Sequence, residues 1–246
     1  MIEHAILLSA GQGSRLLPLT AERPKCLIDF SGRSLIAWQI EMLARGGVRR
    51  IDVVTGFRTD EVERDVMAID DPRVTVTCHF NPFFKVADNL GSCWIVRDRM
   101  DGDFVILNGD TLVGEDVVAT VQAGSEWPIA VTVDEKGEYD SDDMKVTLDG
   151  RRLTAIGKTL SPEESHAESI GFLAFRGEGA ELFREEVRTM MRMPDGVDHW
   201  YLKAIDRIAK TGKVGTVSIA GKDWAEVDYL TDIEDATVLT DRWAAE

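Results

Sequence analysis

Two glycines, an arginine and a lysine stand close together near the start of the chain, directly after an apolar run. The stretch reads LLSAGQGSRLLPLTAERPKCL, residues 7–27. Glycines at the end of a strand leave backbone N–H groups free to approach phosphate oxygens. Arg15 and Lys25 add two cations that suit the same ligand. We therefore predict a phosphate-binding loop, while a structural tight turn is the alternative that a bare G-x-G pattern leaves open.

The remainder of this loop distinguishes between the common kinds of phosphate site. A dinucleotide fingerprint needs a third glycine where Leu16 stands, and Pro18 and Pro24 keep the segment from forming a regular helix. A Walker loop needs G-x-x-x-x-G-K-[ST], which the stretch does not contain. We therefore expect a long, proline-stiffened loop with cations at both ends, able to wrap around a triphosphate.

The elements that must position the loop alternate along the first half of the chain. Residues 4–10 predict a buried strand, and residues 34–47 predict an amphipathic helix capped by Ser34. Further strand and helix patterns follow, up to a strongly apolar strand at 103–110. Such alternation indicates parallel strands with crossover helices, whose ligands bind beyond the carboxyl ends of the strands.

The rhythm changes after about residue 125. Closely spaced strand-like runs between 127 and 175 predict antiparallel additions. Helices are expected around 178–192 and 198–210, then a strand at 213–219 and an acidic helix to the end. We predict one α/β domain over 1–246, with a Rossmann-like, mixed but mostly parallel sheet flanked by helices. Residues 1–125 would form its nucleotide-binding half and residues 126–246 its acceptor-binding half.

Composition excludes several partners. The net charge is −16 and the basic residues are scattered, which argues against a nucleic acid or an anionic membrane as partner. The chain contains no apolar run of the ~18 residues that a membrane span needs. Its first residues run directly into a strand without a signal peptide, and its three cysteines are far apart. We therefore expect a cytoplasmic protein, with its oligomeric state left open.

The loop closely resembles the signature G-x-G-[ST]-R-L-x-P-L-T-x-x-x-P-K of the sugar-phosphate nucleotidyltransferases. The resemblance implies the nucleotide-diphospho-sugar transferase fold and a reaction that transfers a nucleotide. In that family the loop grips the triphosphate of the nucleotide. One departure is Ser9, where the family usually has alanine or glycine. The resemblance implies these nucleotide contacts: Ser9, Ala10, Gly11, Gly13, Arg15 and Lys25.

Two acidic stretches extend the resemblance. Asp110 ends the strand in VILNGDTL, and Asp228 precedes a helix in WAEVDYLTDIEDA. In the family the corresponding aspartates hold Mg²⁺, and Glu226 is a weaker candidate ligand. A hard divalent ion with oxygen ligands neutralises charge where two anions must approach each other. An ordinary turn-forming or capping role for Asp110 is the alternative.

A lysine would contact the phosphate of the second substrate, the acceptor. Lys158 stands in LTAIGKTL, where the family often has a Glu-Lys-Pro motif, here degraded because Gly157 and Thr159 flank the lysine. Lys145 competes for the same role. Either residue could instead be a solvated strand lysine.

The stretch NPFFKVADNLGSCW resembles the phosphocholine and 2-aminoethylphosphonate cytidylyltransferases. By matching position, Asn89, Gly91 and Ser92 would lie near the base and ribose of CTP. An asparagine amide can both donate to and accept from a pyrimidine edge. The alternative is that Asn89 caps its helix and Ser92 is an ordinary helix residue.

An acceptor that carries an amine would need acids and aromatic faces. The second half offers Glu168, Asp198, Trp200 and Tyr201, although Trp200 could equally be a core residue. We therefore predict a Mg²⁺-dependent enzyme that joins CTP to a small phosphate or phosphonate of the phosphocholine or 2-aminoethylphosphonate type and releases pyrophosphate. The alternatives are a sugar-1-phosphate nucleotidyltransferase using CTP, UTP or GTP, a nucleotide-binding protein without turnover, and, more distantly, a dehydrogenase.

Overall fold

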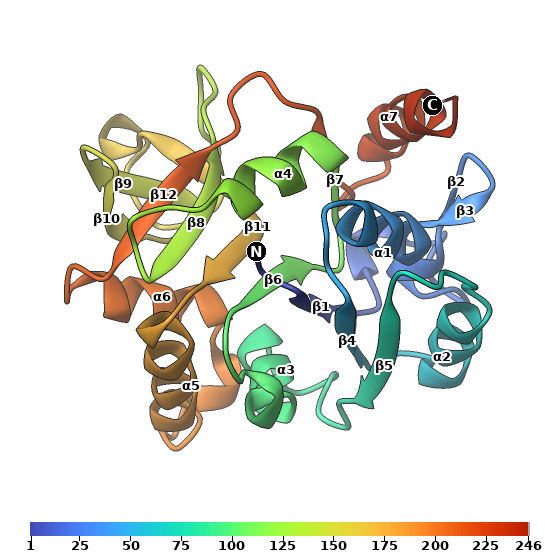
Figure 1. The fold of residues 1–246 in the computed structure, drawn as a ribbon, viewed down its shortest axis with the longest axis horizontal. Helices are drawn as coiled ribbons and strands as arrows, with labels where there is room; N and C mark the ends of the chain where they lie inside the picture. Colours follow the sequence, from blue (N-terminus) through green and yellow to red (C-terminus); the bar gives the residue numbers. More distant parts are fainter. Residues whose placement is uncertain (246) are drawn as a thin grey trace.

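In the computed structural model, which describes residues 1–245, a nine-stranded mixed sheet runs through the molecule with helices on both faces (Figure 1). The strand order is β5-β4-β1-β6-β11-β8-β12-β10-β9. The strands of this sheet are β1 His4–Leu8, β4 Arg50–Thr55, β5 Thr75–Phe80, β6 Phe104–Asn108, β8 Ile129–Asp134, β9 Lys145–Asp149, β10 Arg152–Ile156, β11 Ala167–Phe175 and β12 Val214–Ser218.

Two small two-stranded sheets accompany the large one. They pair β2 with β3 and β7 with β13, namely Asp29–Phe30 with Arg33–Ser34 and Thr111–Val113 with Trp224–Glu226. The α-helices of the described chain are α1 Leu35–Arg45, α2 Thr59–Met67, α3 Asn89–Ile95, α4 Glu115–Ala123, α5 Glu178–Met190, α6 Tyr201–Ala209 and α7 Asp232–Ala244. Short 3₁₀ turns lie at Ser14–Leu16, Lys25–Leu27, Arg97–Arg99, Pro162–Glu164 and Gly196–Asp198.

The alternation of side chains along the strands divides the core between the two faces of the sheet. In β1, Ala5 and Leu7 pack in one core with side chains of α1, α2 and α4. Ile6 and Leu8 point the other way and pack with side chains of α3, α5 and α6. Because successive strand residues face opposite sides, an unbroken apolar strand such as β1 requires helices on both faces.

The first half confirms the predicted parallel arrangement. Strands β5, β4, β1 and β6 are parallel neighbours in that order. Helix α1 begins where expected, because Ser34 Oγ accepts a hydrogen bond from the Ala37 N–H at 3.3 Å, and it ends at Gly46. The carboxyl ends of β1 and β6 therefore lie side by side, and the glycine loop leaves the sheet at this edge.

The second half confirms the predicted antiparallel additions. Strand β11 runs antiparallel to both β6 and β8, and the β9–β10 hairpin extends the far edge. Strand β12 is the exception, since it pairs with β8 in parallel. Helix α4 and the β7–β13 pair were not expected from the sequence. No helix in the described part of the chain is long and apolar enough to cross a membrane.

Candidate active site

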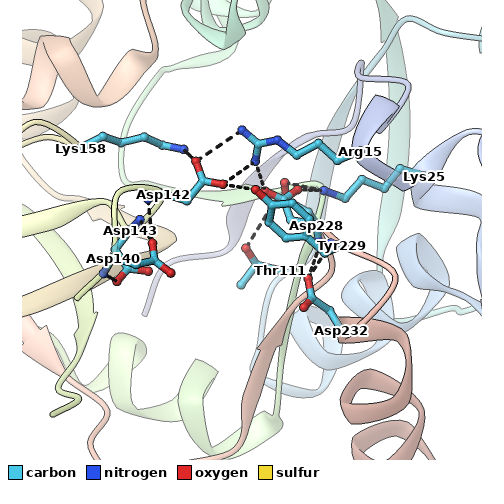
Figure 2. Close-up of polar contacts among 11 residues, drawn as sticks. Arg15, Lys25, Thr111, Asp140, Asp142, Asp143, Lys158, Asp228, Tyr229 and Asp232 are labelled. Atoms are coloured by element: carbon cyan, nitrogen blue, oxygen red, sulfur yellow. Dashed lines mark hydrogen bonds and ion pairs between the residues drawn. The ribbon is translucent and has the colours of Figure 1, made fainter. Parts of the chain in front are cut away.

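The glycine loop is held in a closed shape by its own contacts. Gly13 has a positive φ of 78°, and a Cβ added there would lie 2.8 Å from the Lys25 Cβ. Only glycine allows this approach. Thr20 Oγ1 donates a hydrogen bond to the Gly13 carbonyl at 2.7 Å, and Leu16 is fully buried. The loop therefore brings its two cations together, and Figure 2 shows Arg15 and Lys25 reaching toward Asp228 from the same side.

The acidic residues meet here because of one strand pair. Asp110 follows β6 and directly precedes β7, and β7 pairs antiparallel with β13 so that Thr111 lies opposite Glu226. The Val227 N–H also donates to the Asp110 carbonyl at 2.9 Å. As a result, Asp110, Glu226 and Asp228 each offer an oxygen within 4.8 Å of the others.

A single lysine lies among these carboxylates. Lys25 Nζ donates to Asp110 Oδ2 at 3.0 Å and also contacts Asp228 Oδ1. Burial alone would lower the pKa of Lys25, but the two aspartates hold that pKa above its ordinary value. Glu226 is attracted by the same lysine, but desolvation together with the charges of Asp110 and Asp228 outweighs that attraction and raises its pKa to about 8.

The carboxylate cluster fits a hard divalent cation. Its donors are all carboxylate oxygens, the ligands that Mg²⁺ takes in proteins. The raised pKa of Glu226 agrees with this fit, because Asp110 and Asp228 place further negative charge beside it and Lys25 offsets that charge only in part. Asp110, Asp228 and Glu226 are thus the residues that could hold a metal here.

An aspartate that sequence reasoning missed connects the two sides of the site. Asp142 forms an ion pair with Arg15 Nη1 at 3.2 Å, and it accepts hydrogen bonds from Lys158 Nζ at 3.0 Å and from the Tyr229 hydroxyl. Hydrogen bonds from Tyr229 and Lys158 hold the pKa of Asp142 below its ordinary value. Figure 2 shows Asp142 between Lys158 on one side and Arg15 on the other. The acidic run DSDD at 140–143 was the only sequence signal for it.

A groove beside the loop, of about 620 Å³, is lined by residues 11–15, Phe84, Lys85 and Asp228; we call it the loop groove. It contains the predicted contacts Gly11, Gly13 and Arg15. Ser9 and Ala10, which precede the loop, are buried.

The predicted base contacts in α3 are placed differently. Gly91 is buried, and the buried Ser92 Oγ accepts a hydrogen bond from Asn81 Nδ2 at 3.2 Å. Neither residue lines the loop groove, so their contact with the nucleotide stays a prediction. Phe84 and Lys85, just before α3, line the groove in their place. Their only sequence signal was their position in the same quoted stretch.

A second cavity, of about 350 Å³, lies on the other side of Arg15 and Asp228; we call it the central cavity. Its walls include Asn89, Lys158, Glu168, Asp142, Asp143, Trp200, Asp110 and Glu226. Asn89 Oδ1 accepts from the Tyr201 N–H at 2.8 Å, so this side chain caps α6 and not its own helix. Asn89 therefore faces the central cavity and not the loop groove.

The predicted acceptor residues divide between the cavity and the core. Trp200 is 43% exposed and its ring lies 5.0 Å from Lys158 Nζ, so it is not a core residue. Tyr201 is fully buried and its hydroxyl donates to Asn108 Oδ1 at 3.2 Å. Tyr201 does not line the central cavity, and its contact with an acceptor stays a prediction. Asp198 is exposed and lines a neighbouring cavity.

The two candidate lysines are also distinguished. Lys145 is only 1% exposed, and its Nζ donates to the backbone carbonyls of Asp140 and Asp143. Its charge therefore holds the 140–143 segment in place, and the prediction that it contacts an acceptor phosphate is not supported. Lys158 is the lysine that lines the central cavity.

Glu168 lies in a small acidic group at the wall of the central cavity. It is 8% exposed, and burial raises its pKa to about 7. Lys136 Nζ lies 3.0 Å from Glu168 Oε2 and 2.8 Å from Asp143 Oδ1. One ammonium thus serves two acidic side chains at this wall of the cavity.

Comparison with known proteins gives matches along the whole chain. A relative 25% identical over 258 residues is the CTP:phosphoglutamine cytidylyltransferase of Campylobacter jejuni subsp. jejuni, with 94% of this chain and 98% of that protein covered. The choline-phosphate cytidylyltransferase of Streptococcus pneumoniae is 29% identical over 102 residues, 42% of each chain. The solved structure of the inositol-1-phosphate CTP transferase from T. maritima superposes with a TM-score of 0.80 at 18% identity, covering 98% of this chain and 97% of that one.

These relatives confirm the predicted fold and the predicted kind of enzyme. The model of the nucleotidyl transferase family matches residues 4–138, more than half of the 246 residues. That segment contains the glycine loop, β6 and Asp110. The chain therefore belongs to the nucleotidyl transferase family.

Proposed function

We propose that this enzyme is a Mg²⁺-dependent cytidylyltransferase that joins CTP to a small phosphate or phosphonate acceptor and releases pyrophosphate. One observation carries the proposal. The loop groove and the central cavity meet at Arg15 and Asp228, which line both, beside the carboxylate cluster. A nucleotide in the groove and an acceptor in the cavity would thus bring their phosphates together at that boundary. The names of the cytidylyltransferase relatives support the choice of CTP.

The reaction requires positioning and charge neutralisation more than proton transfer. An oxygen of the acceptor phosphate, already anionic, attacks the α-phosphorus of CTP and forms the new P–O bond. The bond from the α-phosphorus to the β-bridging oxygen breaks, and its electron pair leaves with pyrophosphate. No general base is needed, because the nucleophile carries no proton that must be removed.

The acidic and basic side chains of the site would have different roles in neutralising the charge of this reaction. Asp110 and Asp228, with Glu226, would hold Mg²⁺, which when bound supplies positive charge where two anions meet. Arg15 and Lys25 would stabilise the leaving pyrophosphate. Both are paired with aspartates in this structure, so an entering triphosphate must replace those carboxylates as their partner.

The two ends of the site would recognise the base and the acceptor. The Phe84 ring in the loop groove offers an aromatic face for the base, a contact worth ~1–3 kcal/mol per stacked base. Lys158 would align the acceptor phosphate. An amine on the acceptor would find the carboxylates of Glu168 and Asp143, which share one lysine, and the exposed ring of Trp200.

The test is a screen of pyrophosphate release. CTP, UTP, ATP and GTP are each offered with phosphocholine, 2-aminoethylphosphonate and several sugar-1-phosphates, with and without Mg²⁺. We expect CTP to be preferred, since a site that hydrogen-bonds one base leaves its own polar groups unpaired with another. We also expect an amine-bearing acceptor to exceed the sugar phosphates in kcat/KM.

Other outcomes of the screen would reject parts of the proposal. A sugar-1-phosphate preferred by tenfold or more would favour a sugar-1-phosphate nucleotidyltransferase using CTP, UTP or GTP. Release without any divalent cation would reject the metal. The variant Asp110→Asn should be inactive in every combination, while Asp70→Asn, at an exposed aspartate outside both cavities, serves as the matched control.

A further inference from the structure

A third cavity, of about 410 Å³, opens beside the central cavity; we call it the annex. Its walls are formed by residues 155–160, which end β10 and follow it, and by residues in and around α6. Met144, Lys158, Trp200 and Leu202 line both the annex and the central cavity. These four shared residues place the annex directly beside the cavity where we propose that the acceptor binds. A molecule held by its phosphate at Lys158 could therefore extend past Trp200 into it.

The annex differs from the central cavity in the balance of its charged side chains. Among the described residues that line it are three lysines, Lys158, Lys203 and Lys210, and two acids, Asp198 and Asp206. This excess of positive charge occurs in a chain whose net charge is −16. The central cavity, by contrast, is lined by eight acidic and two basic side chains, so the balance of charged side chains differs between the two cavities.

Two of the three annex lysines, Lys203 and Lys210, share one acidic partner. Asp206 lies 3.3 Å from Lys203 Nζ and 3.3 Å from Lys210 Nζ. It also accepts a hydrogen bond from the Ile156 N–H at 3.2 Å. Lys210 Nζ also donates to the Thr154 carbonyl at 2.7 Å. Since the two ammonium groups share a single carboxylate, they retain capacity for a second anion.

Two further features agree with an anion next to a hydrocarbon chain. Helix α6 has no acid in its first turn, and its positive end borders the annex at Leu202. The apolar side chains of Met144, Ile156, Leu160 and Leu202 line the remaining wall. Small-molecule sites commonly combine such an apolar lining with a few placed polar groups.

We infer that the annex binds the far end of the acceptor and selects one whose phosphate or phosphonate is joined through an apolar chain to a carboxylate. Lys203 and Lys210 bind that carboxylate, while Lys158 holds the phosphate end. This inference rests on the proposed function and names the acceptor class more narrowly. It gives the enzyme a specificity site that phosphocholine, which has no carboxylate, would leave empty.

The test compares acceptors that differ only in the carboxylate. With CTP and Mg²⁺, KM is measured for ω-phosphonocarboxylates with two to five methylene groups and for alkylphosphonates of the same lengths. The length series also measures the span between the two ends of the site. At the chain length that binds best, we expect the phosphonocarboxylate to have a KM at least tenfold lower than that of the alkylphosphonate of the same length. The difference in kcat between the two should be smaller. The dissociation constants of these two acceptors, measured by calorimetry, should differ by the same ratio.

Variants assign the effect to the annex. Lys203→Met and Lys210→Met should each bring the ratio of the two KM values toward one, because each removes a cation from the carboxylate. Asp206→Asn should increase the ratio, because it removes the competing anion. Lys213→Met is the matched control, since Lys213 pairs with Glu178 and lies outside the annex walls. That variant should keep both the ratio and the activity of the wild type.

The outcomes separate this inference from the proposed function. Equal KM and binding for carboxylate and alkyl acceptors at every length would overturn the annex inference, even if CTP is turned over with phosphocholine or 2-aminoethylphosphonate. If the ratio of the two KM values stayed unchanged in both Lys203→Met and Lys210→Met, the annex inference would be overturned as well. No pyrophosphate release from CTP with any acceptor would instead reject the proposed function, and the annex inference with it.

Discussion

Lys25 Nζ lies 3.0 Å from Asp110 Oδ2, so the cation at the end of the glycine loop is paired with a carboxylate that we propose as a metal ligand. The same ammonium contacts Asp228. The side chain of Lys25 is 10% exposed, so this pairing takes place largely out of water. Lys25 thus places positive charge beside Asp110 and Asp228, where a bound divalent cation would also place it.

Replacing Lys25 should therefore affect both turnover and stability. Lys25→Met should lower kcat/KM by about 10²–10³, because it removes a cation aimed at developing negative charge. Without Mg²⁺ the variant should melt several degrees below the wild type, since Asp110 and Asp228 then repel each other. Addition of Mg²⁺ should recover most of that loss in a thermal melt. Lys222→Met, at a lysine paired with Asp116, is the control; a Lys25 variant that behaves like it would contradict the prediction.

The carboxylate cluster should bind a divalent cation before any substrate is added. Mn²⁺, as a paramagnetic substitute, should bind the wild type with a stoichiometry of one and lose at least tenfold in affinity in Asp110→Asn or Asp228→Asn. Activity should disappear with chelator and return with Mg²⁺. Glu226→Gln should have a smaller effect than either aspartate variant. Unchanged Mn²⁺ binding in both aspartate variants would show that the cluster is not a metal site.

Asp142 should compete with the phosphates of both substrates. It is paired with Arg15 at 3.2 Å and with Lys158 at 3.0 Å, the cations proposed for the nucleotide and the acceptor. Asp142→Asn should lower KM for CTP and for the acceptor by about 3–10-fold, because an amide is a weaker competitor than a carboxylate. Asp140→Asn, in the same acidic run, is the comparison. A rise in both KM values would mean instead that Asp142 positions the two cations.

The buried carboxyl of Glu168 should make stability depend on pH. Its pKa is raised from 4.5 to about 7, so the folded state favours the protonated acid. The stabilisation from this group is fully present below pH 4.5 and is lost as pH rises through 7. The free energy of unfolding of the wild type relative to Glu168→Gln should thus fall by roughly 1–3 kcal/mol between pH 4.5 and 8. Urea titrations at both pH values measure it, and an equal difference at both would refute it.

The local pattern of residues was sufficient for the first half of the fold and for the loop. Strand periodicity predicted β1, β4, β5 and β6, and the Ser34 cap and Gly46 predicted the limits of α1. Gly13 and the cations of the loop are close in sequence, so their chemistry could be inferred without knowing the fold. These features depend on short-range sterics and hydrogen bonds, which neighbouring residues decide.

Side-chain placement at the second half of the site depended on packing. Trp200 and Tyr201 are adjacent and chemically alike, yet one faces the cavity and the other is buried beside Phe183. The rotation of α6 against α5 decides which of them turns inward, and no local pattern specifies that rotation. Lys145 and Lys158 were likewise indistinguishable as strand lysines, until the fold buried one against backbone carbonyls.

The sequence by itself determined the glycine loop with its two cations, the parallel half of the sheet and the family of the enzyme. Only the tertiary structure decided how the acids assemble. Asp110 and Asp228 come together because β7 pairs with β13, a contact between segments far apart in the chain. Asp142 pairs with both Arg15 and Lys158, and its contact with Arg15 also joins segments far apart in the chain. Such contacts depend on the packing of the whole sheet, because each residue's own neighbours in sequence are compatible with many other partners.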